Sequence, residues 1–126
     1  MFSDKTPISA LATVIQILDA ELPCPVGASK MDDWGNVYIT VKRLGSHRYT
    51  AVTNTANVLV ECYAESELES EMLADLAESI LRRSIQKRQG NYYLTYWDTT
   101  QGPSSLRHPD GLHRHQFIGI ATVPAR

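Results

Sequence analysis

The stretch VLVECYAESELESEMLADLAESILRR, residues 58–83, decides the fold because it joins a strand directly to a long helix. Residues 58–63 alternate with the two-residue period of a strand. Ser66, with a glutamate three residues later, has the pattern of a capped helix start. We therefore predict a strand over about 58–63 and a helix over about 66–89, which ends at Gly90.

The predicted helix has one apolar face and one acidic face. At about 100° per residue, seven apolar side chains share the first face: Leu68, Met72, Leu73, Leu76, Ala77, Ile80 and Leu81. We expect Leu76 and Ile80 to face the sheet, and the outer Glu71, Asp75 and Glu78 to face solvent or a neighbouring subunit. The glutamates of the first turns spread around the helix instead of converging, which indicates a solvated helix start and no metal or acid–base site.

A second helix is predicted near the N-terminus. Thr6 is a capping residue, and Pro7 suits the first helical position, where its missing N–H is not needed. An apolar stripe follows, and Thr13 faces away from it. Pro23 stops the pattern, so we place this helix at about residues 7–21.

The remaining elements are strands and loops. Three further strands are predicted, at about residues 36–43, 92–97 and 115–123. The last of them has apolar residues on both sides, which favours a central position or a covering layer on each face. Polar composition predicts long loops at residues 23–35, 44–57 and 98–114. Residues 48–53 are rich in β-branched side chains and leave open a further strand or one arm of a hairpin.

Together these elements predict an α+β fold in a single domain, residues 1–126. It is a single layer of mainly antiparallel sheet, of about four to five strands, with two helices packed on it. A hydrophobic content of 43% and a charged content of 21% are ordinary for a globular protein. No apolar run approaches the roughly 20 residues of a membrane-spanning helix. Residues 1–12 lack a signal-peptide pattern, so we expect synthesis in the cytoplasm and no membrane partner.

Charge and motifs point away from nucleic-acid binding and from catalysis. A formal net charge of -2, with scattered basic residues, argues against general nucleic-acid binding. No phosphate-binding loop, nucleophile elbow or other catalytic motif is present. We therefore expect no enzyme activity and no cofactor.

Two histidines and two cysteines are the candidate metal ligands of the sequence. His113 and His115 would place both imidazoles on one face of a strand, as some zinc sites require. No third ligand has a suitable spacing, so solvent-facing histidines are favoured and no metal site is predicted. Cys62 has the parity of a buried thiol, and Cys24, between two prolines, is not expected to form a disulfide. The alternative of a different class is a small ligand- or metal-binding domain that uses the segment with His113 and His115 and the aromatic run at 92–97.

Taken in order, four segments resemble the tail terminator family of long-tailed bacteriophages, particularly its small forms in phages of actinobacteria. They are the helix ALATVIQILDAEL, the strand VYITVKRLG, the stretch at residues 58–83 and the ending PDGLHRHQFIGIATVPAR. In the ending, Pro109, Asp110 and Arg114 match the family pattern, while His115 stands where a tyrosine is common. The segments cover well over half of the sequence.

This resemblance implies a structural virion protein at the neck, or top of the tail. Such a protein closes the growing tail tube as a homohexameric ring and joins it to the head-completion or stopper protein. It assembles in the host cytoplasm, and phage DNA passes through its channel without specific binding. Another head-to-tail joining protein, such as a stopper or tail-completion subunit, is the nearer alternative.

A ring subunit needs contact surfaces, and exposed arginines and aromatic residues are enriched at protein contacts. Candidate interface residues are Trp34, Lys42, Arg43, Arg48, Arg107, His113 and Arg114.

Overall fold

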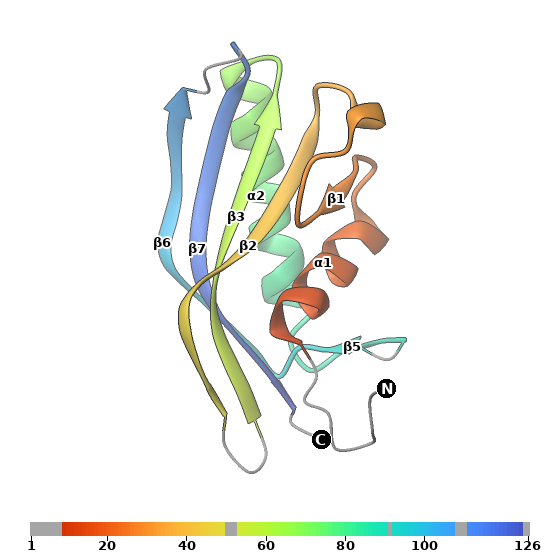
Figure 1. The fold of residues 1–126 in the computed structure, drawn as a ribbon, viewed down its shortest axis with the longest axis vertical. Coiled ribbons are helices and arrows are strands. Elements are labelled where there is room, and N and C mark those ends of the chain that lie inside the picture. The colour runs from red at the N-terminus through yellow and green to blue at the C-terminus, as the bar shows by residue number, and fades with distance from the viewer. Residues whose placement is uncertain (1–8, 50–52, 91, 108–110, 125–126) are drawn as a thin grey trace.

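The computed structural model describes residues 9–49, 53–90, 92–107 and 111–124 (Figure 1). Five strands form one sheet in the order β1-β2-β3-β7-β6, and β4 and β5 form a separate pair. The elements are α1 Ala10–Glu21, β1 Val26–Gly27, the 3-10 helix η1 Asp32–Trp34, β2 Tyr38–Tyr49, β3 Thr53–Ala64, α2 Glu67–Arg83, β4 Arg88–Gln89, β5 Tyr92–Tyr93, β6 Tyr96–Arg107 and β7 His113–Pro124. Only β1 pairs in parallel within the sheet, so the predicted α+β fold with a mainly antiparallel sheet is confirmed.

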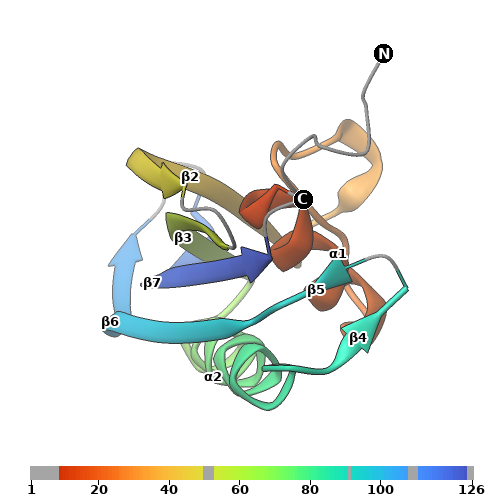
Figure 2. The same ribbon diagram turned by 90° about the horizontal axis from the view of Figure 1, so that it is seen from below.

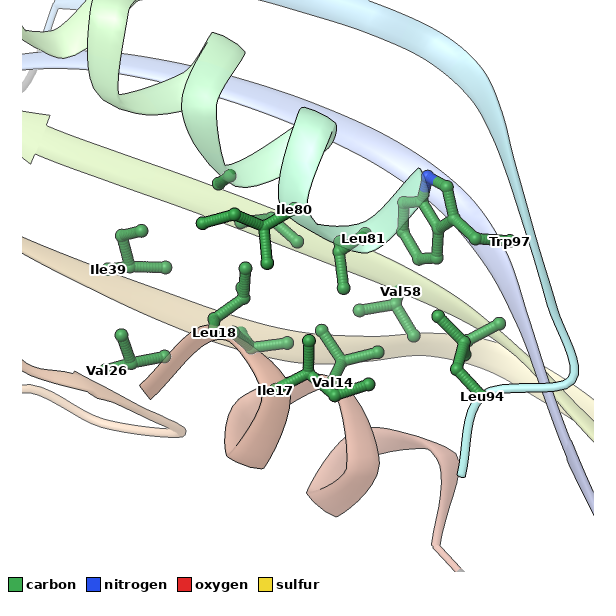
Figure 3. Packing of buried hydrophobic residues seen from close by; sticks show 14 of the residues in the cluster. Val14, Ile17, Leu18, Val26, Ile39, Val58, Ile80, Leu81, Leu94 and Trp97 are labelled. Atoms are coloured by element: carbon green, nitrogen blue, oxygen red, sulfur yellow. The ribbon is translucent and has the colours of Figure 1, made fainter. Parts of the chain in front are cut away.

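The core lies between the two helices and one face of the sheet. Figure 2, viewed along the long axis, shows α1 and α2 together at one side of the strands. In Figure 3, Ile17 and Leu18 of α1 point toward Ile80 and Leu81 of α2. This arrangement explains why apolar residues recur at helical spacing in both helices and at alternate positions in the strands.

Helix α1 starts with a side-chain cap and stops before a proline. The Ser9 hydroxyl accepts a hydrogen bond from the Ala12 amide at 3.0 Å. The predicted start at residues 6–7 lies outside the described residues, and the helix ends at Glu21, as expected. Thr13 was wrongly placed on the outer side: it is fully buried, and its hydroxyl donates to the Ser9 carbonyl at 2.8 Å, which satisfies its polar atom locally.

Helix α2 begins as predicted but is shorter. The Ser66 hydroxyl accepts from the Glu69 amide at 3.1 Å, which confirms the cap. The helix ends at Arg83 and not near residue 89, because Gln86 adopts a φ of 61°. Its amide then donates to the Leu94 carbonyl at 2.7 Å, so the chain leaves the helix to pair with a later segment.

The buried face of α2 differs from the predicted one. Its buried residues are Ser70, Ala74, Ala77, Ile80 and Leu81. Ile80 therefore faces the core as expected, whereas Leu68, Met72 and Leu76 are exposed. Small residues on the buried side let the helix axis approach the sheet closely, and the larger apolar side chains point outward. Of the acidic residues, Glu71 and Asp75 are exposed as expected, and the half-buried Glu78 pairs with Arg82.

The predicted loop at residues 44–57 is instead most of a long hairpin. Strand β2 continues to Tyr49 and β3 starts at Thr53, so the hairpin alternative is the correct one. Gly45, with a φ of 58°, lies in a register shift between Leu44 and His47. Such a bulge lets a strand continue past a residue that breaks regular pairing.

The prediction of a loop at residues 98–114 is also wrong. The predicted strand at 92–97 breaks after Tyr93, and β6 then runs from Tyr96 to Arg107 at the edge of the sheet. One register shift precedes its Gly-Pro segment, and a second contains it. Proline is tolerated in an edge strand because one side of that strand pairs with no neighbour. Of the third predicted loop, residues 23–35 contain only β1 and η1.

Strand β7 lies between β3 and β6, as its two apolar sides predict, but the described helices cover only one of its faces. Residues at alternate positions from His115 to Val123 are buried against the helices. The intervening residues are half-buried on the opposite side. Among the described helices, none is long and apolar enough to cross a membrane.

Candidate protein-interaction surface

The side of the sheet that faces away from the helices is the most distinctive surface of the molecule, and we call it the outer face. Its residues align across the strands because β2, β3, β7 and β6 are in register. The rows, read from β2 to β6, are Tyr38–Tyr63–Arg114–Leu106, Thr40–Glu61–Gln116–Ser104, Lys42–Leu59–Ile118–Gln101 and Leu44–Asn57–Ile120–Asp98. The first two rows contain a tyrosine pair and the charged residues Glu61 and Arg114. The aliphatic residues Leu59, Ile118 and Ile120 lie at the centre of the other two rows.

Glu61 organises the polar end of the outer face. Its side chain is 6% exposed, and its carboxylate accepts from the Thr40 hydroxyl at 3.0 Å. It also pairs with Arg114 at 3.1 Å and with Lys42 at 3.3 Å. Burying a carboxylate is costly unless it is paired and hydrogen-bonded, and here all three partners come from the two adjacent strands. The network therefore fixes two cations at defined positions on the sheet.

Aromatic rings extend this network toward the β1 loop. Tyr38 and Tyr63 stack with centroids 4.6 Å apart and planes 20° apart. The Arg114 guanidinium lies 5.9 Å from the Tyr63 ring centroid, and Lys30 lies 5.7 Å from that of Tyr38. Trp34 contacts the other side of the cluster, 5.9 Å from Tyr38. Cation–π geometry of this kind holds both cations over apolar surface.

A pocket of about 330 Å³ opens beside the stacked tyrosines. Its lining residues are Ala28, Ser29, Lys30, Tyr38, Thr40, Lys42 and Tyr63. The lining contains two lysines, Lys30 and Lys42, and the ammonium group of Lys42 pairs with the Glu61 carboxylate. Such a pocket favours a partner that presents a carboxylate or another anion together with apolar atoms.

The structure brings together three of the predicted interface residues. Lys42 and Arg114 bind the same carboxylate, and Trp34 joins them through the Tyr38 ring. Sequence reasoning missed Glu61 and the tyrosine pair. Lys42 and Arg114 lie one row to either side of Glu61 on the two neighbouring strands, so the register of three strands is needed to place Glu61 between them.

The other predicted interface residues lie elsewhere. Arg43 is exposed, but it pairs with Val58 and so has the opposite parity from the outer face. Arg107 stands opposite His113 where β6 and β7 meet, and Arg48 stands opposite Thr55 in the long hairpin. The side chains of Arg48 and Arg107 are outside the described part of the chain.

His115 is buried, contrary to the expected solvent-facing position. Its Nδ1 atom lies 2.7 Å from the Ser70 hydroxyl of α2, so the ring joins the sheet to the helix. His113 has the same strand parity and is half-buried. In the described ranges, no three histidine, cysteine, aspartate or glutamate side chains gather as a metal site.

The two thiols are free and both are shielded. Cys62 is fully buried in β3, as its parity predicted, and burial raises the pKa of its thiol far above the ordinary value. Burial also raises the pKa of the half-buried Cys24 thiol. A thiol kept protonated is a poor nucleophile, so neither group has the environment of a reactive cysteine.

No protein-family model and no curated protein matches this sequence. The fold is similar to that of a chain in a solved structure described as the virion of a native gene transfer agent particle, with a TM-score of 0.69. The superposition covers 91% of this chain and 94% of that chain, at 12% sequence identity. At that identity the likeness establishes a shared fold.

Proposed function

We propose that this protein is a structural component of a phage-like virion and acts there as the tail terminator. The observation that carries the proposal is the fold match over nearly the full length of both chains to a chain of a virion particle. The fold match supports a virion structural protein. A fold alone does not give a function, and the finer role of tail terminator rests on the resemblance of the four sequence segments to that family.

In this role the protein forms a homohexameric ring at the neck, between the tail-tube protein and the head-completion or stopper protein. The described residues suit a subunit with several contact surfaces: an outer sheet face, an exposed face of α2 and extended strand ends. Lys42, Arg114 and Trp34 are the interface candidates that form a continuous cluster. Arg43, Arg48, Arg107 and His113 are candidates for other contacts, and phage DNA crosses the channel without a specific site.

The polar network of the outer face supports a structural role in place of catalysis. The Glu61 carboxylate pairs with Lys42 and Arg114, and it also accepts a hydrogen bond from the Thr40 hydroxyl on the neighbouring strand. A general base needs a free lone pair within reach of a substrate proton. The ion pairs and the hydrogen bond instead fix the relative positions of β2, β3 and β7.

Native mass spectrometry and electron microscopy of the purified protein test the ring, and labelling of particles tests its place. The expected results are a closed hexamer and a label at the top of the tail. Particles made without the gene should contain tubes of uncontrolled length, because nothing closes them. A persistent monomer that is missing from the neck would overturn the proposal. Normal tail length with failed head joining would instead favour a stopper or tail-completion subunit.

A further inference from the structure

Helix α2 exposes an apolar stripe that the core does not use. Leu68, Met72 and Leu76, spaced four residues apart, are 65%, 62% and 43% exposed. Residues at this spacing are neighbours on one side of a helix. Elsewhere in the described residues, the exposed large apolar side chains are scattered: Met31, Tyr96 and Leu106. We call the three α2 residues the α2 stripe, and a contiguous apolar surface of this kind commonly marks a contact site.

The α2 stripe is acidic at its margins. Glu69, Glu71 and Asp75 are exposed beside it. The two arginines of the last turn do not offset them, because Arg82 pairs with Glu78 and Arg83 pairs with Glu21. A partner for the stripe therefore needs apolar atoms at its centre and positive charge around them.

The outer face of the same chain has these properties. Leu59, Ile118 and Ile120 form its half-buried aliphatic centre, with no described layer above them. Lys30, Lys42 and Arg114 supply three cations, against the paired carboxylate of Glu61 and the exposed carboxylate of Asp98 in the last row. The outer face and the α2 stripe are also on opposite sides of the sheet, because α2 packs on the inner side.

We propose that the α2 stripe of one copy binds the outer face of the next copy, head to tail. Leu68 and Met72 pack on the aliphatic centre, and the carboxylates beside them approach Lys30 and Lys42 at the pocket. Two different surfaces on opposite sides of a subunit give a heterologous contact, which closes into a ring when the rotation per subunit allows it. This contact rests on the proposed ring and identifies the surfaces that build it.

Charge reversal tests the contact, because in a head-to-tail ring two variants that are each defective should assemble when they are mixed. Glu71→Lys/Asp75→Lys reverses the charge at the margins of the stripe. Lys30→Glu/Lys42→Gln reverses one charge of the outer face and removes a second, without placing a new carboxylate next to Glu61. Each variant alone should associate at least about tenfold more weakly than wild type in mass measurements over a concentration series. An equimolar mixture should restore the ring, since reversed and native surfaces then alternate around it. Asp19→Lys, a charge reversal at an exposed site on α1 outside both surfaces, is the control and should keep the ring.

Cross-linking separates this contact from a contact between two α2 stripes. In a Cys24→Ser background, Met72→Cys with Ile118→Cys and a short bis-maleimide should give a covalent ladder up to the closed ring. Met72→Cys alone should give no covalent dimer. Circular dichroism verifies that each variant is folded.

The outcomes distinguish the contact from the function. Stripe-reversed protein that still forms wild-type rings overturns the contact and leaves the proposed function standing. Covalent dimers from Met72→Cys alone, or a mixture that fails to assemble, likewise overturn it. Stripe variants that keep the ring but lose binding to tail tubes assign the stripe to the tube protein instead. Wild type that is monomeric both in solution and in particles overturns the proposed function and the contact together.

Discussion

The two faces of the central sheet are built from the same strands yet hold together differently. On the inner face, Phe117 meets Trp97 edge to face at 6.1 Å, and the helices exclude water from both rings. On the outer face one residue away, Ile118 is only half-buried, and the polar row beside it is held by the ion pairs of Glu61. The inner face stabilises the fold by burial, whereas the outer face holds charged groups at fixed positions through ion pairs.

The strongest test of this contrast compares two neighbouring residues of β7. Phe117→Ala should lower the free energy of unfolding by about 3–5 kcal/mol, because it leaves a cavity beside Trp97. Ile118→Ala should cost about half of that or less, because its side chain is already partly in water. Urea unfolding at low, equal protein concentration measures both. Equal losses would show that the outer face is as much a core as the inner one.

A second test concerns the carboxylate at the centre of the outer face. Glu61→Gln should lower the free energy of unfolding by about 1–3 kcal/mol, because Lys42 and Arg114 lose their common counter-charge. Glu71→Gln on the exposed side of α2 is the matched control and should change it by less than about 0.5 kcal/mol. If the two substitutions have the same effect, the network contributes nothing beyond an ordinary surface charge.

A buried hydrogen bond between Ser70 and His115 joins the inner face to the helix layer, and its removal should have a smaller effect. Ser70→Ala should cost about 1 kcal/mol and change the imidazole nitrogen shifts of His115 in NMR spectra, because Nδ1 loses its partner. Ser79→Ala, on the exposed side of the same helix, should leave both stability and those shifts unchanged. Unaltered shifts in Ser70→Ala would exclude this bond in solution.

Thiol labelling should show the contrast with no change in stability. Because the pKa of each thiol is raised, the thiolate fraction at neutral pH is lower than in a free cysteine, and labelling is slow. Iodoacetamide followed by mass spectrometry should modify Cys24 slowly, and faster as the pH rises, while Cys62 reacts only after unfolding in guanidinium. Equally fast labelling of the two in the native protein would contradict a dry inner face.

Local signals in the sequence predicted the parts of the fold that local interactions control. Ser66 caps α2 through its own side chain, and Pro23 ends α1 by its own geometry, so each could be identified without the rest of the chain. The parity of Cys62 was likewise enough to place it inside.

Long-range pairing decided what the sequence could not predict. Residues 98–107 have the glycine, proline and serine content of a loop, and they form β6 only because β7 pairs with them. Leu68, Met72 and Leu76 match the helical period as well as true core residues do, since periodicity does not distinguish a buried face from a contact surface. For the candidate site, Lys42 and Arg114 were found by residue type, whereas Glu61 between them depends on the register of three strands.

Strand β6 leaves the sheet with a long free edge, and its irregularity has a consequence for solubility. A regular unpaired edge is a template on which a strand of another molecule can add, and the product is an open-ended aggregate. Pro103 cannot donate a backbone hydrogen bond, and the register shifts at Thr99–Gln101 and Gln101–Ser104 interrupt the ladder. Uncontrolled edge-to-edge growth is thereby discouraged. In the proposed ring, association would use the side-chain surfaces, which a fixed number of copies can satisfy.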